Sequence, residues 1–191
     1  MFSDLITSKT RVKVLKLFLA HAHEMFHVRE IVRRVDEEIN AVRRELLYLE
    51  KKKVLKKEPR ANRVYYMIDP NYTFYNEMIE INAKLEGLGG DIIKNKVKLG
   101  KIKFAMLSGK YVLGIRDNPE EIDLLVVGTV VLPELSLVIK KAEGENEIEI
   151  NYTVMSEEEF VFRKKRRDPF ISSIIHGPRL MLIGDEIGLL S

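Results

Sequence analysis

The sequence contains no cysteine, which excludes disulfide bonds, zinc sites built on thiolates and thiol nucleophiles. It also has no apolar run of the roughly 18 residues that a membrane helix needs. The longest candidate, LLVVGTVVLPEL, is interrupted by Gly128, Thr129 and Pro133. The first residues lack a basic segment followed by an apolar one, so we expect no secretion signal. These absences predict a cytoplasmic protein without membrane contact.

The small net charge of +3 is unevenly distributed along the chain. Residues 1–75 contain 16 Lys and Arg against 10 Asp and Glu, a net of +6. Residues 76–191 contain 16 against 19, a net of −3. A basic first part followed by a mildly acidic second part indicates a module that binds a polyanion, joined to a module of another kind.

Apolar residues recur at helical spacing in three segments of the first part. The first is SKTRVKVLKLFLAH, and the second is VREIVRRV, which follows a short strand-like piece over 25–27. The third is INAVRRELLYLEKKK, in which Ile39, Val42, Leu46 and Leu49 form the apolar face. VLKKEPRANRVYYMI then predicts two strands around a turn over 59–62. Three helices followed by a basic hairpin are the element order of a winged helix.

The outer face of the predicted third helix carries polar side chains suited to DNA. Arg can pair bidentately with guanine and Asn with adenine, whereas the run of three lysines over 51–53 is better suited to phosphates. The predicted turn adds two arginines that would lie along the DNA backbone or in the minor groove. The DNA-binding residues expected on these grounds are Asn40, Arg43, Arg44, Tyr48, Lys51, Lys52, Arg60 and Arg63.

The stretch from Ser8 to Ile68 resembles the winged-helix DNA-binding domain of ArsR-type transcriptional regulators, on its element order and on SKTRVKVLKLF and INAVRREL. The resemblance implies binding to double-stranded DNA. ArsR-type sensors often bind metal through Cys or His, and His21, His23 and His27 lie close together in the sequence. No thiolate or fourth ligand accompanies them, so we expect a solvated helix end at this place.

A connecting helix is predicted over residues 71–89. Phe74, Met78, Ile81, Leu85 and Leu88 repeat at intervals of four and three, which is the stripe of a coiled coil. We expect this helix to form a homodimer that spaces two winged helices; the alternative is a helix packed on its own domain. The three glycines of the following segment, Gly87, Gly89 and Gly90, are expected to end it.

The remaining residues, 90–191, predict a small α/β domain with a mixed sheet. Strands are expected over 101–108, 121–128, 147–155 and 179–184. Helices are expected over 91–99, over 132–142, after a capping box of Ser156 and Glu159, and over 168–177.

Two carboxylates mark the second of these predicted strands. In a strand, Glu121 and Asp123 would point to the same face, where such a pair can hold Mg²⁺. LSGKYVLGIRDNPEEIDLLVVG looks like the signature of the DNA polymerase β-type nucleotidyltransferase superfamily. That resemblance implies nucleotide binding through Ser108, Gly109 and Lys110. It also implies a metal site at Glu121, Asp123 and a third carboxylate, for which Glu149 is one candidate.

The segment departs from the family pattern. Gly109 follows Ser108, whereas the family has glycine before serine, and Glu121 stands at the position of the first aspartate. Pro119 and Glu120 add bulk and charge beside the expected site. We therefore predict no confident catalytic residue, and a domain that serves ligand binding or dimerisation rather than catalysis.

Taken together, the sequence predicts an α+β chain of two domains: a winged helix-turn-helix over 1–70, the connecting helix over 71–89 and a nucleotidyltransferase-like domain over 90–191. The expected function is a DNA-binding transcriptional regulator. An active Mg²⁺-dependent nucleotidyltransferase targeted by its winged helix is the alternative, and a dimeric protein without DNA affinity is a third reading.

Overall fold

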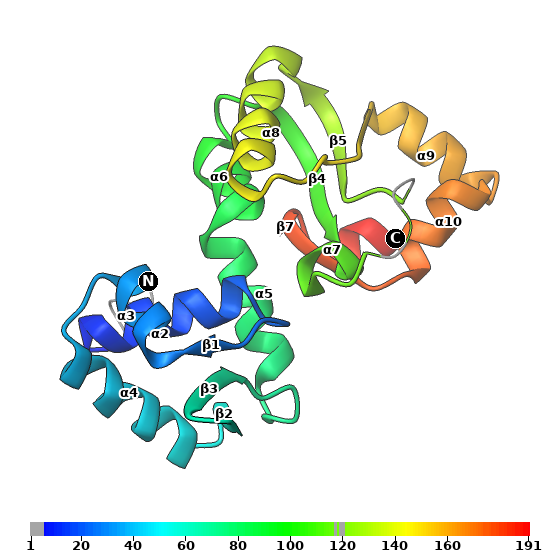
Figure 1. Cartoon of the computed structure of the whole chain (residues 1–191). Coiled ribbons are helices and arrows are strands. Elements are labelled where there is room, and N and C mark those ends of the chain that lie inside the picture. The colour runs from blue at the N-terminus through cyan, green and yellow to red at the C-terminus, as the bar shows by residue number, and fades with distance from the viewer. Residues whose placement is uncertain (1–5, 117, 119–120) are drawn as a thin grey trace. The chain divides into compact units, whose positions relative to one another are not determined.

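The computed structural model describes residues 6–116, 118 and 121–191, and in them the chain is a mixed α+β protein with two separate sheets (Figure 1). The chain divides into two compact units, Met1–Asn82 and Ala83–Ser191. Among the described helices, none combines the length and apolar character required to span a bilayer.

Three helices form the body of the first unit: α2 (Lys9–Ala20), α3 (Val28–Val35) and α4 (Ile39–Lys51). Each begins with a side chain that accepts a backbone N–H, and for α2 this is Ser8, whose Oγ accepts from the N–H of Arg11 at 3.2 Å. The predicted helical faces are confirmed in the main, because the following residues are buried: Val12, Leu15, Phe18, Leu19, Ile31, Val35, Val42, Leu46 and Leu49.

The sheet of the first unit has the order β1-β3-β2, with antiparallel pairs, from β1 (Phe26–His27), β2 (Leu55–Arg60) and β3 (Arg63–Ile68). The predicted turn over 59–62 is shorter than expected. Pro59 pairs with Val64 inside the ladder and Arg60 pairs with Arg63, which leaves two residues in the turn. Proline is tolerated there because β2 is an edge strand, where a missing N–H removes no essential bond.

The connecting segment is not one helix. α5 covers Tyr75–Leu85, and after a break at Gly87, whose φ is +58°, α6 covers Gly87–Asn95. The prediction that Gly89 and Gly90 end a helix is wrong. Both lie inside α6, where an added Cβ on Gly89 would come within 2.2 Å of the carbonyl oxygen of Ala83. These glycines therefore allow α5 and α6 to approach closely.

The predicted apolar stripe is consequently divided between two helices. Leu88 is buried in the core below α6. Phe74, just before α5, is 55% exposed, Ile81 in α5 is 39% exposed, and Met78 is half-buried. A continuous seam over both helices is therefore absent, and the exposed part of the stripe is about two turns long.

The second unit has a four-stranded sheet of order β6-β5-β4-β7. β4 (Gly100–Ser108) is antiparallel to both β5 (Leu124–Val130) and β7 (Arg179–Ile183), whereas β6 (Tyr152–Met155) is parallel to β5. The predicted mixed sheet is confirmed. Its second and third strands begin later than expected, since Glu121 and Asp123 precede β5, and Glu149 precedes β6.

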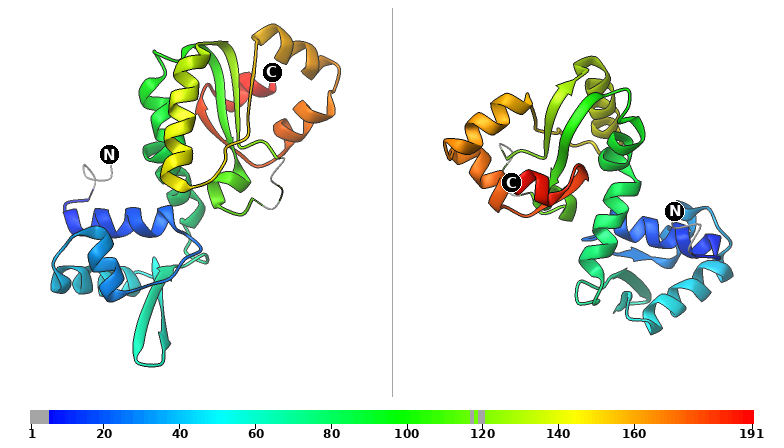
Figure 2. Two further views of the ribbon diagram at one scale, coloured as in Figure 1. Left: turned by 45° about the horizontal axis from the view of Figure 1, so that its top comes forward. Right: turned by 180° about the vertical axis from the view of Figure 1, so that it is seen from behind.

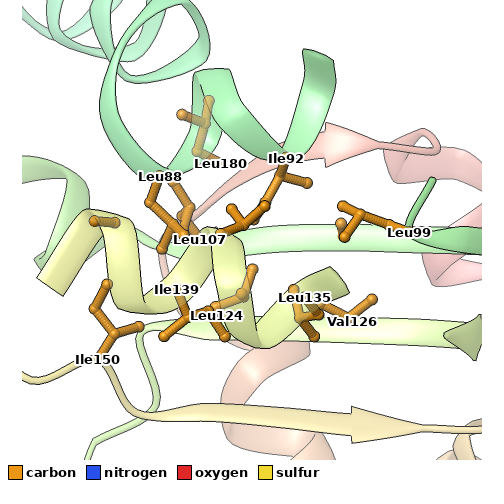
Figure 3. Packing of buried hydrophobic residues seen from close by; sticks show 13 residues of the cluster. Leu88, Ile92, Leu99, Leu107, Leu124, Val126, Leu135, Ile139, Ile150 and Leu180 are labelled. Atoms are coloured by element: carbon orange, nitrogen blue, oxygen red, sulfur yellow. The ribbon is translucent and has the colours of Figure 1, made fainter. Parts of the chain in front are cut away.

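Helices cover both faces of this sheet, because its strands carry apolar residues on both sides. On one face, α6 and α8 (Leu132–Asn146) pack against alternate strand residues such as Ala105 and Leu107 (Figure 3). On the other face, Phe104 and Met106 meet α9 (Glu157–Lys165), α10 (Pro169–His176) and α11 (Glu186–Leu190). Neither α11 nor the short helix α7 (Gly109–Leu113) was expected from the sequence.

Candidate functional site

The outer face of α4 carries the side chains that the sequence predicts there. Asn40, Arg43, Arg44, Tyr48 and Lys51 are all exposed, as is Lys52 at the end of the helix. The carboxylates of the same helix are held by other cations. Glu45 pairs with Arg11, and Glu50 pairs with Lys57 at 2.7 Å. The two arginines on the outer face therefore add to its positive charge instead of balancing these acids.

A buried ion pair fixes α4 to α2. Glu45 is only 3% exposed, and its carboxylate accepts from Ser8 Oγ and from Arg11 Nε, both at 2.7 Å. Burial alone would raise the pKa of Glu45, but these two hydrogen bonds and the charge of Arg11 outweigh it and lower the pKa below its ordinary value. The guanidinium of Arg11 also lies 3.8 Å from the centre of the Tyr48 ring. Tyr48, predicted to contact DNA, thus already contacts Arg11.

The N-terminus of α4 is capped by an acid. Glu38 accepts from the backbone N–H groups of Asn40 and Ala41 at 2.8 and 3.1 Å, and from the side-chain amide of Asn40 at 3.2 Å. An acidic cap stabilises the helix start through the helix dipole. It also occupies one N–H of the Asn40 side-chain amide.

The β2–β3 hairpin extends from the three helices of its unit (Figure 2). Lys56, Lys57, Arg60 and Arg63 are exposed along it. Arg60 and Arg63 are cross-strand partners at the turn, and Arg60 donates to Glu58 at 2.8 Å. Exposed ion pairs of this kind contribute little energy and exchange readily. The hairpin therefore presents several cations on a projecting strand pair.

The histidines of the first unit have separate local contacts. His27 caps α3 by accepting from the N–H of Glu30 at 3.2 Å, and His21 pairs with Glu24 at 2.9 Å. Within the residues that the structure describes, no group of three His, Asp or Glu side chains is placed to hold a metal ion. The geometry thus gives His21, His23 and His27 no shared site.

A cleft of about 390 Å³ opens in the second unit where β4 ends and β5 begins. Its walls are mostly apolar and include Met106, Leu125, Phe170 and Ile174. The polar residues that line it come from five segments: Ser108, Lys110, Glu121, Asp123, Ser173 and Arg179. The first four of these are predicted site residues, whereas Gly109 and Glu149 are not part of the lining.

Asp123 is the most enclosed of these side chains, at 1% exposure. Its Oδ2 accepts from a guanidinium N–H of Arg116 and, at 2.9 Å, from the backbone N–H of Asn151. Its Oδ1 is buried and has no hydrogen-bond partner among the described residues. Burial, reinforced by the negative charge of Asp123 and opposed by Arg116, raises the pKa of the neighbouring Tyr111 to about 12. Asp123 therefore lines the cleft with a carboxylate that Arg116 already engages.

Of the other two predicted metal ligands, one is paired with a lysine and the other has its side chain outside the site. Glu121 accepts from Lys110 at 2.8 Å. Glu149 has an exposed side chain, and only its backbone carbonyl reaches the site, where it accepts from Arg116 at 3.0 Å. The resemblance implies Mg²⁺ here, but two organic cations already neutralise the two acids. The residues present do not fit a metal ion. Pro119 and Glu120, expected beside the site, lie outside the described residues.

Gly109 has a packing role that differs from its predicted one. Its backbone N–H donates to the carbonyl of Pro178 at 2.7 Å, and an added Cβ would lie 2.7 Å from the side chain of Pro178. The glycine is required for this contact between α7 and the segment before β7. Its N–H is consequently not available to a phosphate.

The basic run Arg163–Asp168 also contacts its own unit. Arg163 pairs with Glu159 at 2.6 Å, Lys164 donates to the carbonyl of Leu189 at 2.8 Å, and Asp168 caps α10. These contacts give the run a structural role at the end of α9.

Sequence reasoning missed Arg11, Glu45 and Arg116 as site residues. Glu45 and Arg11 are 34 residues apart, and Arg116 meets Glu149 across 33 residues, so no local spacing signals either contact. Arg116 does lie within the acidic stretch that attracts attention in the sequence. A single arginine near two acidic residues is too common in sequences to predict a site by itself.

Comparisons of the chain with protein-family models, with curated proteins and with solved structures give no match.

Proposed function

We propose that this protein is a DNA-binding transcriptional regulator whose first unit is a winged helix of the ArsR type. One observation carries the proposal. The outer face of α4 and the β2–β3 hairpin are both exposed and basic, while Glu45 and Glu50 of α4 are paired with other cations. A recognition helix and a wing of this charge suit the major groove and the adjoining phosphates.

The proposal assigns different tasks to different side chains. Asn40, Arg43 and Arg44, in the first half of α4, would contact base edges. Lys51, Lys52, Arg60 and Arg63 would bind phosphates and set the register without reading sequence. Tyr48 would support Arg11, whose guanidinium lies over its ring.

The test is fluorescence anisotropy with a duplex chosen by selection from random DNA and with an unselected duplex, each over a range of salt concentrations. Arg43→Ala should lose about 1–3 kcal/mol of binding free energy on the selected duplex and almost nothing on the other. Lys52→Ala should weaken both equally and reduce the salt slope by about one.

Lys140→Ala, which removes an exposed lysine from α8 of the second unit, is the matched control and should change neither duplex. If Arg43→Ala and Lys52→Ala reduce binding equally on both duplexes, the assignment of roles is wrong. If wild type shows no salt-dependent binding to any duplex, the proposal itself fails.

We also propose that the protein is a homodimer formed through α5. Ile81 on this helix and Phe74 just before it are exposed, and exposed apolar side chains at helical spacing favour a partner helix. Sedimentation of the double variant Phe74→Ser, Ile81→Ser should show monomers where wild type shows dimers. A monomeric wild type would contradict the dimer while leaving DNA binding open.

For the second unit we propose a nucleotidyltransferase-like domain that binds a ligand without catalysis. Its support is the cleft, which has apolar walls and several polar groups at one end. The alternative, an active Mg²⁺-dependent nucleotidyltransferase, is favoured by the collection of Ser108, Lys110, Glu121 and Asp123 in that cleft. It requires the two acids to be released from Lys110 and Arg116.

Calorimetric titration with nucleoside triphosphates, with and without Mg²⁺, separates these two readings. Ligand binding without catalysis predicts an affinity that does not depend on Mg²⁺ or on Asp123→Asn. Mg²⁺-dependent binding that Asp123→Asn abolishes would favour the enzyme and justify a search for an acceptor.

A further inference from the structure

We propose that the guanidinium of Arg116 takes the place of a metal ion at Asp123, so that the cleft of the second unit is a metal-independent site. The inference rests on the proposed non-catalytic role of this unit. It concerns the cation beside Asp123 and not the DNA-binding face of α4. An experiment can therefore contradict this inference while leaving the proposed DNA binding intact.

Two oxygen atoms converge on one nitrogen of Arg116. Its Nη1 donates to Oδ2 of Asp123 and, at 3.0 Å, to the backbone carbonyl oxygen of Glu149. Carboxylate and backbone carbonyl oxygens are the ligands that hard cations such as Mg²⁺ prefer. The point between these two oxygens, where an ion would need to lie, is filled by an N–H group of the protein itself.

The carboxylate of Asp123 is enclosed as well as paired. Oδ2 also accepts from the N–H of Asn151, and Oδ1 is shielded from solvent. Asp123 is 1% exposed, and its partner Arg116 has a side chain that is 21% exposed. A pair this enclosed opposes separation, since either charge alone would be left poorly solvated.

The second acid is neutralised in the same manner. Glu121 accepts from Lys110 at 2.8 Å, and both side chains line the cleft. The positive charges of Arg116 and Lys110 therefore balance the negative charges of Asp123 and Glu121. Each of the two carboxylates is thus already paired with a cation of the chain, which opposes the binding of a divalent ion.

The same contacts give Arg116 a structural task that a metal would otherwise perform. It joins three segments: its own loop after α7, the residue before β5, and the residues before β6. Asn151 adds to this junction by donating its side-chain amide to the carbonyl of Glu121 at 3.1 Å. One side chain thus holds the beginnings of two parallel strands together.

The test is titration of the full chain with Mn²⁺. Binding is monitored as a decrease in the electron paramagnetic resonance signal of free Mn²⁺. Wild type should show no binding that depends on Asp123. Arg116→Ala should bind Mn²⁺ roughly tenfold or more tightly than wild type, because an enclosed carboxylate is left without its cation. The double variant Arg116→Ala, Asp123→Asn should lose this gain. Arg166→Ala, an exposed arginine of the same unit, should resemble wild type.

Thermal unfolding provides a second readout for a weakened variant. Mn²⁺ should raise the Tm of Arg116→Ala and leave that of wild type unchanged. If Arg116→Ala does not fold, Mn²⁺ binding by wild type and by Asp123→Asn still tests the proposal. Mn²⁺ binding by wild type that is lost in Asp123→Asn would overturn the proposal. So would a folded Arg116→Ala that binds Mn²⁺ no better than wild type.

Discussion

Charge is used in opposite ways in the two units. On α4 and the β2–β3 hairpin, Arg43, Arg44 and Lys51 stand exposed on a face whose acids are paired with other residues. In the cleft of the second unit, Asp123 and Glu121 each have a cation of the chain beside them. The first arrangement leaves positive charge for a partner, whereas the second uses its charges inside the protein.

The contrast shows that counting charged residues does not identify a site. The stretch with the most suggestive chemistry in the sequence, around Glu121 and Asp123, folds into internal ion pairs. The solvated face of α4, which could be read as ordinary surface, retains its charges. Substitution of Asp123 should therefore affect folding of the second unit, whereas substitution of the exposed cations of α4 should affect the proposed DNA binding.

The largest effect is expected for Asp123→Ala. It leaves the largely enclosed Arg116 guanidinium without its carboxylate, which should cost about 3 kcal/mol of unfolding free energy, at the lower end for a broken buried pair because Arg116 is partly exposed. Urea unfolding, combined with hydrogen exchange to read the second unit, measures this. Glu121→Ala is the matched control, and it should cost at most about 1 kcal/mol because its pair with Lys110 is more exposed. Equal losses in both variants would contradict the distinction.

Gly109→Ala should destabilise the second unit by about 1–3 kcal/mol, because the new Cβ must displace Pro178. The same unfolding measurement tests it. If the glycine serves nucleotide binding alone, stability will be unchanged and only ligand affinity will fall.

Glu45→Gln should destabilise the first unit by about 1–3 kcal/mol, since it weakens a buried bond network between α2 and α4. The pKa of Glu45 is lowered in the folded state, so its contribution is present at pH values above its ordinary pKa of 4.5. It is lost as the pH falls through the folded-state pKa. Unfolding measured from neutral to acidic pH should therefore show wild type and variant converging at low pH. A gap that stays constant would show that the ion pair is not its origin.

The smallest effect on folding is expected for Lys51→Ala, Lys52→Ala, within about 0.5 kcal/mol, because both side chains are exposed. The same double variant should reduce the salt slope of DNA binding by about two. If the double variant loses stability and the salt slope of DNA binding does not change, these lysines serve folding, as the paired charges of the second unit do.

Local patterns predicted the elements well. The spacing of Val42, Leu46 and Leu49 gave the buried face of α4 directly, and the alternation in β3 gave its hairpin. The capping box was also readable, since Ser156 accepts from the N–H of Glu159 at 3.1 Å. These features depend on residues that are close to one another in the sequence.

What the sequence did not predict depends on contacts between distant segments. The burial of Glu45 follows from Ser8 and Arg11 on another helix. The glycines at 89 and 90 are explained by the approach of α5 to α6, not by a helix end. At Asp123, the residue type and its place near a strand end were informative. The engagement with Arg116 was not, because arginine can reach many partners from one position in the sequence.

The edge strand β2 bears on how copies of this protein meet in solution. An exposed strand edge is a template for pairing with another chain, and proteins commonly block such edges with proline and lysine. β2 carries Pro59, which offers no N–H, together with Lys56 and Lys57, which repel an identical strand. The hairpin is therefore protected against edge-to-edge aggregation, even though it projects from its unit. Self-association at high concentration should instead involve α5 and remain reversible.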